Sequence, residues 1–348
     1  MIKEILEKQY FNKEDIKQLL LAEGEDMKLL LDKALAVKLE KLDNYVHLRG
    51  LIELSNICRK SCLYCGVRSG NNKVVRYTIT DDEVLECAEM AYKLGYGSVA
   101  IQSGERNDRA FTGRITKLVR EIKKIGDGAL GITLSLGEQT PEVYREWFEA
   151  GAHRYLLRIE SSNENLYYKI HPHDETHDFK KRLDCIDSLI SIGYQTGTGV
   201  MIGLPFQTVD DLADDLFFFK NKNVAMVGMG PFIPHPDTPL AGEHGGTLEL
   251  ALRTMAVMRL LMPDINIPAT TAMESLHPQG RIMALQAGAN VVMPNVTEGE
   301  YRRLYELYPG KICINDTPAH CRSCIGLKIQ SIGRTIGQGW GGHKTNRN

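Results

Sequence analysis

The sequence has no apolar stretch long enough to cross a lipid bilayer, because a membrane-spanning helix needs about 20 apolar residues in succession. It also lacks an uninterrupted apolar run near its start, where MIKEILEKQYFNKEDIKQLL is amphipathic and charged. A secretory signal peptide requires such a run. We therefore expect neither a membrane protein nor a secreted one, and a cytoplasmic location follows as the expectation.

A polybasic run is also absent, and the formal net charge is −2. Composition therefore gives no reason to expect nucleic acid or an anionic membrane as a partner. Hydrophobic residues make up 43% and charged residues 25% of the 348, which is ordinary for a soluble globular protein. This length suits one large barrel domain or two ordinary domains, and nothing demands more than a monomer.

Six of the eight cysteines fall in two tight clusters. One cluster is Cys58, Cys62 and Cys65, and the other is Cys313, Cys321 and Cys324. Two groups of three cannot pair off internally as disulfides without leaving an odd thiol in each. The clusters therefore favour metal binding by reduced cysteines.

From residue 45 onward, short apolar or β-rich runs alternate with amphipathic helical stretches, which indicates a parallel α/β architecture. The helical patterns include Asp81–Leu94, Thr140–Ala150, Phe179–Ile192, Val209–Lys222 and Thr247–Leu261. The expected strands are His47–Asn56, Ser98–Ser103, Gly131–Gly137, Arg154–Glu160, Gly197–Gly203, Met226–Ile233, Asn266–Met273 and Asn290–Asn295.

A doubly wound sheet could use the same pattern, but eight strands at this spacing favour a TIM-type (β/α)8 barrel. We expect residues 1–44 to form an N-terminal helical cap, 45–308 the barrel and 309–348 a C-terminal extension bearing an accessory metal site. The glycine-rich end, GQGWGGHKTNRN, is expected to fray.

In such a barrel the chemistry lies where the strands end, at their C-terminal side. The first cysteine cluster follows the first expected strand, and QSGE, SLGE, RIESSN, IGLP and PATTA end the second, third, fourth, fifth and seventh. Polar residues at successive strand ends predict one shared site there.

The first cluster reads Cys58-Arg-Lys-Ser-Cys62-Leu-Tyr-Cys65, so three thiolates lie within eight residues. Thiolates are the ligands of iron–sulfur clusters, and a cubane offers four irons, so one iron would stay open to a small ligand. The rival interpretations are a zinc knuckle and incidental thiols. Zinc needs a fourth ligand, and the nearest residues, His47 and Cys87, lie on a strand start and in a helical pattern.

The cysteine spacing, with an aromatic residue before the third cysteine, resembles the radical S-adenosylmethionine (SAM) superfamily. The resemblance implies a [4Fe-4S] cluster whose open iron binds the methionine moiety of SAM. It further implies one-electron cleavage of SAM to methionine and a 5′-deoxyadenosyl radical, with the protein positioning the cofactor.

The resemblance also implies how SAM is held. Gln102-Ser103-Gly104-Glu105 matches a GGE-like motif with serine in place of the first glycine, which puts the Ser103 contact in doubt more than that of Glu105. Glu160 is placed for the ribose hydroxyls and Arg182 for the methionine carboxylate, while backbone atoms elsewhere pack on adenine. The implied SAM-binding residues are Tyr64, Gln102, Ser103, Gly104, Glu105, Ser135, Glu160, Arg182, Ile202, Gly203 and Leu204.

Beyond these motifs, stretches such as GITLSLGE, AGAHRYLLRIE, GYQTGTGVMIGLP and GMGPFIPHPDTPLA are similar to the HydE-type maturases of [FeFe]-hydrogenase. The similarity runs from about residue 45 to 325 and implies assembly of the binuclear iron subsite. It implies an iron–cysteine complex with CO and cyanide as substrate, HydG and HydF as partners, and reduced flavodoxin or ferredoxin as electron donor. The family's substrate cavity matches Arg158, Thr133, Thr270, Thr271 and Tyr305.

Biotin synthase and methylornithine synthase share the general layout. A sulfur donor of the biotin-synthase kind would need cysteines on the strands, but Cys87 and Cys185 lie in helical patterns, so sulfur insertion is disfavoured. The resemblance implies an accessory iron–sulfur cluster, 2Fe-2S or 4Fe-4S, at Cys313, Cys321 and Cys324. A structural zinc site that includes His320 is the alternative there.

Two other functions stay open. One is a related radical SAM enzyme acting on a small thiol, thiazolidine or amino acid. The other is a non-catalytic iron–sulfur carrier, which would cleave no SAM and would leave Glu105, Glu160 and Arg182 without a role.

Overall fold

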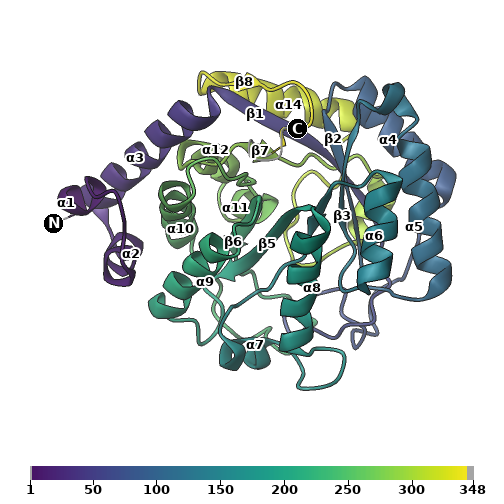
Figure 1. The fold of residues 1–348 in the computed structure, drawn as a ribbon, viewed down its shortest axis with the longest axis horizontal. Helices are drawn as coiled ribbons and strands as arrows, with labels where there is room; N and C mark the ends of the chain where they lie inside the picture. The colour runs from purple at the N-terminus through teal and green to yellow at the C-terminus, as the bar shows by residue number, and fades with distance from the viewer. Residues whose placement is uncertain (1, 343–348) are drawn as a thin grey trace.

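The computed structural model describes residues 2–342, and a curled parallel sheet forms its centre (Figure 1). The strands follow the order β6-β5-β4-β3-β2-β1-β7, and β8 pairs with β1. Every pairing is parallel. The strands are β1 (Tyr45–Ser55), β2 (Ser98–Ser103), β3 (Gly131–Ser135), β4 (Arg154–Leu156), β5 (Gln195–Ile202), β6 (Met226–Pro231), β7 (Val291–Val292) and β8 (Thr335–Ile336).

Helices connect the strands and cover the outside of the sheet (Figure 1). The helices predicted from the sequence are confirmed, and threonine caps explain several starts, since Thr80 and Thr208 form capping boxes before α4 and α9. The elements are α4 (Asp81–Lys93), α5 (Arg109–Ile122), η1 (Ile125–Gly128), α6 (Pro141–Ala150), α7 (Glu164–Ile170), α8 (Phe179–Ile192), α9 (Val209–Asn221), α10 (Leu248–Leu261), α11 (Thr271–Leu276), α12 (Gly280–Gln286), α13 (Gly299–Leu304) and α14 (Pro318–Ser331).

The predicted strand Asn266–Met273 does not form as a strand. Asn266 makes an isolated bridge to Met226 of β6, and Pro268 makes one to Val291 of β7. Pro268 lacks an N–H to donate, and Thr271 already begins α11, so no ladder can extend. The two bridges nevertheless link β6 to β7 through this segment. The other seven predicted strands are present.

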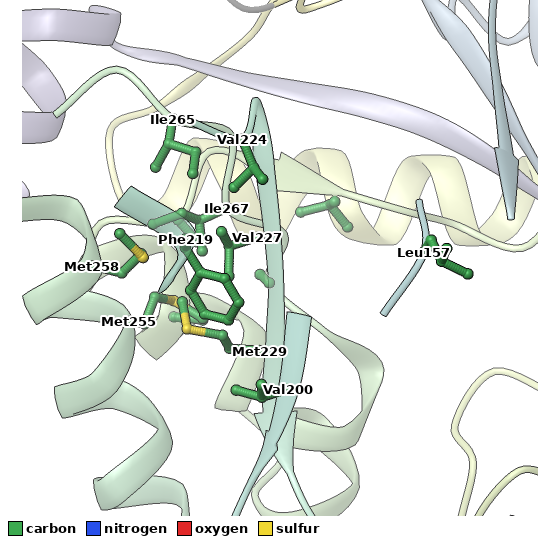
Figure 2. Close-up of a cluster of buried hydrophobic side chains, with 14 of the residues drawn as sticks. Leu157, Val200, Phe219, Val224, Val227, Met229, Met255, Met258, Ile265 and Ile267 are labelled. Carbon is green, nitrogen blue, oxygen red and sulfur yellow. The ribbon is translucent and has the colours of Figure 1, made fainter. Parts of the chain in front are cut away.

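The core between the sheet and its outer helices is fully apolar where β5 and β6 meet α9 and α10 (Figure 2). Its labelled members include Val200, Phe219, Val227, Met229, Met255, Met258, Ile265 and Ile267, and all of these side chains are inaccessible to solvent. Burial of each such side chain contributes roughly 1.5–3 kcal/mol. The packing fixes the strands whose C-terminal ends carry polar residues.

Three helices precede the sheet, namely α1 (Ile2–Leu6), α2 (Lys13–Leu20) and α3 (Gly24–Leu42). They lie at one side of the molecule, where α3 packs along α10 and α2 packs on α9 and α10. None of the helices within residues 2–342 is both long enough and apolar enough to cross a membrane.

The glycine-rich end does not fray over Gly337–Gly342, which corrects the sequence expectation; residues 343–348 lie outside the described residues. Trp340 donates from Nε1 to the Ala129 carbonyl at 2.7 Å and stacks on His153. The carbonyl of Trp340 accepts from Arg154, and that of Gly341 accepts from Arg49. The tail therefore crosses the N-terminal end of the sheet and accepts a hydrogen bond from each of two buried guanidinium groups.

We expect truncation after Ile336 to destabilise the protein by at least about 2 kcal/mol, because each hydrogen bond from a charged donor is worth about 1.5–3 kcal/mol. Burial lowers the pKa of Arg49 to about 10, so this guanidinium is costly to leave unbonded. Thermal unfolding checks the expectation. Truncation after Gly342 is the matched control, and equal melting temperatures for the two truncations would contradict it.

Candidate active site

The first cysteine cluster lies in the loop that follows β1, at the C-terminal end of the strands. Backbone hydrogen bonds tie this loop to the end of β2: Gly104 N–H donates to the Ser55 carbonyl at 2.8 Å, and Arg59 N–H donates to the Glu105 carbonyl at 2.9 Å. The Glu105 N–H also donates to Cys58 Sγ at 3.3 Å. The GGE-like segment thus lies directly against the cysteine loop, as predicted.

Two glycines allow this close approach. A Cβ on Gly104 would lie 2.4 Å from the Ile57 carbonyl oxygen and 2.8 Å from Cys58 Cβ. A Cβ on Gly66, next to Cys65, would lie 2.2 Å from the Glu306 carbonyl oxygen. Contacts this short exclude any side chain at either position, so these two glycines set the packing of the cysteine loop.

Cys58, Cys62 and Cys65 are free thiols, and they lie near enough to influence one another's ionisation. Burial and, to a lesser extent, the neighbouring Cys58 raise the pKa of Cys62 to about 12. Burial and the other two thiols likewise raise the pKa of Cys65. Three thiols that oppose one another's ionisation need a cationic partner to become thiolates, which an iron–sulfur cluster supplies.

Within residues 2–342, no three His, Cys, Asp or Glu side chains converge closely enough to hold a single metal ion. This arrangement does not favour the zinc interpretation. A cubane binds each thiolate through a different iron, so its ligands lie farther apart than those of one ion.

The segment after α7 clamps the cysteine loop from the other side. Leu63 N–H donates to the Ile170 carbonyl at 3.0 Å, and Ser61 N–H donates to His177 Nε2 at 3.0 Å. His177 in turn contacts Asp174 through Nδ1 at 2.8 Å. Because Nε2 accepts, Nδ1 carries the proton and donates to Asp174. His177 is fully buried, so it supports the turn that carries Cys62.

Four buried charged residues gather beside the thiols. Lys60 Nζ lies 2.9 Å from Glu138 Oε1 and 3.5 Å from Glu105 Oε1. Arg182 Nε lies 2.8 Å from the same Glu138 oxygen, and Arg182 Nη2 lies 3.9 Å from Glu105 Oε2. The Glu105 Oε2 atom also accepts the Glu138 N–H at 3.0 Å. Two carboxylates and two cations therefore balance in a space shut off from water.

The charges in this network act on one another. Burial raises the pKa of Glu105, while Arg182 and Lys60 oppose the rise. Burial also disfavours the ionised form of Glu138, yet Arg182 and Lys60 hold its pKa below the usual range. Glu105 Oε1, Glu138 Oε1 and Arg182 Nε complete no hydrogen bond of good geometry among the described residues. These atoms can still bind an amino group and a carboxylate, which is what the methionine end of SAM presents.

Glu160 follows β4 in a conformation that a non-glycine residue rarely adopts, with φ of 64°. Strain of this kind concentrates at functional sites. The Glu160 carboxylate is held by Arg158, whose Nε lies 2.6 Å from Oε1 and whose Nη2 lies 3.0 Å from Oε2. The structure thus joins a residue predicted to bind SAM to one predicted to bind substrate, which the sequence did not foresee.

The loop that carries Glu160 is anchored from α9. Ser162 donates to Asp215 Oδ1 twice, from N–H and from Oγ, each at 2.6 Å. Asn163 Nδ2 donates to Asp211 Oδ1 at 2.7 Å. Asp215 is only 1% exposed, and burial raises its pKa to about 7 against the hydrogen bonds from Ser162.

Because its pKa is higher in the folded than in the unfolded chain, Asp215 stabilises the fold most below about pH 4 and loses that contribution as pH rises to about 7. Asparagine does not ionise, so we expect Asp215→Asn to keep its stability as pH rises. At pH 8 its free energy of unfolding should exceed that of the parent by up to about 4 kcal/mol. Denaturant unfolding at pH 5 and pH 8 checks the difference. Asp214→Asn, on the exposed neighbour, is the control, and an unchanged pH slope in Asp215→Asn would refute the assignment.

A second, small apolar cluster lies where adenine was predicted to pack. Leu204 belongs to it with Ile170, Phe232 and Leu240, and Tyr64 packs against it. Gly203 has φ of 75°, and its N–H donates to Gln207 Oε1 at 2.7 Å, as the Leu204 N–H does at 3.2 Å. The side chains of Leu204 and Tyr64 therefore share one apolar cluster beside the predicted adenine position.

The remaining predicted SAM residues line the ends of β2 and β3. Ser103 Oγ turns back to the Gly104 carbonyl at 2.7 Å, so this hydroxyl is already used. Gln102 and Ser135 are register neighbours across β2 and β3.

The predicted substrate residues do not all meet. Gln102, Thr271 and Tyr305 line one cavity, and Thr271 Oγ1 lies 2.6 Å from the Tyr308 hydroxyl. Thr270 caps α11 beside Gly230 of β6, with its hydroxyl unpaired in the described part of the chain. Thr133 instead accepts from Arg154 Nε at 2.9 Å, toward the end of the sheet that the tail covers.

At the C-terminal extension, the structure brings Cys313 and Cys321 together. The hydrogen bond from Cys313 lowers the pKa of the Cys321 thiol, and Arg281 and Arg302 lower it further. Cys324 lies three residues farther along α14 and is exposed. His320 is exposed too and pairs with Asp316 at 3.1 Å, so it does not join the cysteines.

Sequence reasoning missed Lys60, Glu138 and His177. Lys60 lies between two predicted ligands, and Glu138 ends the SLGE segment, so both had a positional signal, although only Ser135 of that segment was predicted to bind. His177 gave no such signal, because its contact with Ser61 spans 116 residues.

Comparisons with known proteins agree with this geometry. The radical SAM superfamily pattern matches residues 52–219, and the biotin and thiamin synthesis associated domain matches residues 230–313. The [FeFe] hydrogenase maturase subunit HydE of Thermotoga maritima is 46% identical over 344 residues, covering 99% of this chain and 97% of that protein.

Two solved structures share the fold. The crystal structure of methylornithine synthase matches with a TM-score of 0.82 at 22% identity, covering 97% of each chain. That of HydG, a maturase of the [FeFe]-hydrogenase, matches with 0.81 at 20% identity, covering 96% of this chain and 75% of the other. At these identities the likeness shows the fold alone, and it confirms the predicted α/β barrel class.

Proposed function

Since this chain belongs to the HydE family of the radical SAM superfamily, we propose that it acts in assembly of the [FeFe]-hydrogenase active site, on the binuclear iron subsite. The reaction is reductive cleavage of SAM to a 5′-deoxyadenosyl radical. The substrate is an iron–cysteine complex that carries CO and cyanide. The protein works in the cytoplasm as a monomer.

The residues that would hold the cofactors are those already placed together. Cys58, Cys62 and Cys65 are the ligands of a [4Fe-4S] cluster with one open iron, which binds SAM. When bound, the cluster supplies the electron that breaks the sulfonium C–S bond. Glu105, Glu138, Lys60 and Arg182 orient the amino and carboxylate groups of the methionine end.

The observation that carries the proposal is the juxtaposition of three free thiols with a buried, charge-balanced network whose polar atoms are incompletely satisfied. An iron–sulfur carrier has no use for such a network, because a carrier needs no site for an amino acid beside its cluster. A SAM-binding enzyme needs both features on the same side of the barrel. This difference favours the enzyme over the carrier.

Glu160 contacts the cofactor SAM, and Arg158 contacts the substrate. Glu160 presents its carboxylate to the ribose hydroxyls, and Arg158 fixes that carboxylate while its Nη1 donates to the Gly228 carbonyl of β6 at 3.0 Å. Thr270, Thr271 and Tyr305 supply hydroxyls around the substrate, while the apolar surface of Tyr64 and Leu204 excludes water from the adenine side.

The C-terminal cysteines hold an accessory iron–sulfur cluster, 2Fe-2S or 4Fe-4S, outside the reaction itself. The proximity of Cys313 and Cys321, with Arg281 and Arg302 favouring the Cys321 thiolate, supports thiolate ligation there. Reduced flavodoxin or ferredoxin donates the electron, and HydG and HydF act before and after this enzyme.

The test is anaerobic reconstitution with iron and sulfide, reduction, addition of SAM and chromatography for 5′-deoxyadenosine. Glu160→Ala is expected to weaken SAM binding by about 10–100-fold with the iron content unchanged, since about 1.5–3 kcal/mol is lost with a charged acceptor. Glu164→Ala, on the exposed first turn of α7, is the control. A loaded cluster that forms no deoxyadenosine under any reductant would favour the carrier.

A further inference from the structure

A cavity of about 100 Å³ lies between the inner face of the barrel and the C-terminal extension. A water molecule needs at least about 10–15 Å³ of such a cavity, so this one has room for a small head group. It is continuous with the proposed substrate site, since Gln102, Thr271 and Tyr305 form part of its wall. Its charged wall is formed by Glu53 of β1, Arg281 of α12 and Lys311 of the extension.

Glu53 projects from β1 into this cavity and is 2% exposed. Its Oε1 atom pairs with Lys311 Nζ. Its Oε2 atom has no hydrogen-bond partner among residues 2–342. The Oε2 atom of this buried carboxylate is thus free to accept a hydrogen bond from a ligand. A buried carboxylate oxygen without a hydrogen-bond partner is unfavourable in free energy.

Asn295 provides the matching donor. Its Oδ1 atom accepts a hydrogen bond from the Thr297 N–H at 2.9 Å. This bond fixes the orientation of the amide, so the donor Nδ2 lies on the side away from Thr297. Nδ2 is buried and has no hydrogen-bond partner in the described part of the chain. Burial raises the pKa of the Glu53 carboxyl, and Lys311 and Asn295 oppose the rise. Asn295 thus lies within reach of Glu53, but Asn295 Nδ2 and Glu53 Oε2 complete no hydrogen bond of good geometry among residues 2–342.

Lys311 has donor capacity left as well. Its Nζ atom donates to Glu53 Oε1 and to the Tyr305 carbonyl, and an ammonium group carries three protons. The cavity therefore holds one unfilled acceptor and two unfilled donors. Because Lys311 is paired with Glu53 and Arg281 with Glu274, a ligand without net charge fits this cavity better than a lone cation or anion.

We propose that Glu53, Asn295 and Lys311 bind the zwitterionic head group of an α-amino acid. Its ammonium group donates to Glu53 Oε2, and its carboxylate accepts from Asn295 Nδ2 and Lys311 Nζ. The inference rests on the proposed function and names the part of the substrate that this side of the site recognises. The side chain of the amino acid then extends past Tyr305 and Thr271 toward the cysteine cluster.

The test compares three thiols on the anaerobically reconstituted full chain with SAM present: L-cysteine, 3-mercaptopropionate, which lacks the ammonium group, and cysteamine, which lacks the carboxylate. All three carry the same thiol, so any contact with the cluster cancels in the comparison. Calorimetric titration is expected to show L-cysteine binding at least tenfold more tightly than either truncated ligand. Equal affinities, or no binding by any of the three, would overturn the proposal.

Variants then assign each contact. Glu53→Gln is expected to lower L-cysteine affinity about tenfold or more and to leave 3-mercaptopropionate unchanged. Lys311→Met is expected to lower L-cysteine affinity and to leave cysteamine unchanged. Asn295→Asp keeps the acceptor for Thr297 N–H, so it guards against misfolding, and it should reject both carboxylate ligands while retaining cysteamine. Lys93→Met, on exposed α4, is the control.

A merely structural role for these residues predicts that all three ligands weaken together, and that result would overturn the site. Deoxyadenosine is measured on the same preparations. Its absence from the parent protein counts against the proposed function. Loss of ligand selectivity while deoxyadenosine still forms overturns the head-group site alone.

Discussion

Cys62→Ser is expected to abolish 5′-deoxyadenosine formation, with a loss well beyond the 10–100-fold that removal of an outer partner of a metal site costs. Serine replaces a soft thiolate by a poorly ionised hydroxyl, which iron–sulfur clusters do not favour. Cys62 is also the middle ligand of the loop held by Ser61 and Leu63, so no other cysteine can move into its place.

Cys87→Ser is the matched control, because it makes the same chemical change in a buried thiol of α4. This variant should keep its cluster and its activity. Iron and sulfide content, the electron paramagnetic resonance signal after reduction, and chromatography of the nucleoside separate the two. Deoxyadenosine formed by Cys62→Ser at a rate near that of the parent protein would refute the assignment of the triad.

The cysteine triad and the strand ends could be predicted from the sequence because both depend on short spacings. Three thiols within eight residues define a ligand set locally, and the apolar strands show where the chain reaches the same end of the sheet. Cys58 and Glu105 are therefore brought together by β1 and β2, as expected. Family resemblance supplied the identity of the cofactor, which spacing alone did not.

The resemblance implied Glu105 and Arg182, but their pairing with Lys60 and Glu138 could not be predicted, because it is set by packing between distant segments. Lys60 reads as an ordinary charged residue between two cysteines, and only the fold shows it buried between Glu105 and Glu138. The same holds for Arg158, which the resemblance assigned to substrate and which the structure pairs with Glu160.

The prediction that the glycine-rich tail frays was wrong for a different reason. Glycine-rich composition predicts freedom, but Gly97 and Gly339 lie so close that a Cβ on Gly97 would be 1.7 Å from the Gly339 carbonyl oxygen. In this chain the glycines permit close packing across the end of the barrel. Composition does not distinguish the two uses of glycine, because both depend on the absence of a side chain.

Arg182→Met is expected to remove SAM binding and also to destabilise the fold by about 3–5 kcal/mol, the usual cost of leaving a buried charge without its partner. Glu105 and Glu138 would then share only Lys60. Without the guanidinium the pKa values of Glu105 and Glu138 rise, so the contribution of these two groups to stability is fully present below about pH 4 and is lost as pH increases. Unfolding at two pH values and SAM titration measure the two effects separately.

Two further variants separate fold from binding. Arg182→Lys keeps the charge but loses the planar fork that contacts both carboxylates, so it should recover most of the stability and little of the SAM affinity. The double variant Arg182→Met with Glu138→Gln removes one charge of each sign, and it should recover stability without recovering binding.

If Arg182→Met binds SAM as the parent does, the network serves the fold alone, and the methionine end of SAM must be held by other residues. If the single and the double variant both fail to bind SAM while only the single one is unstable, instability is not the cause of the loss, and the Arg182–Glu138 pair itself contacts SAM.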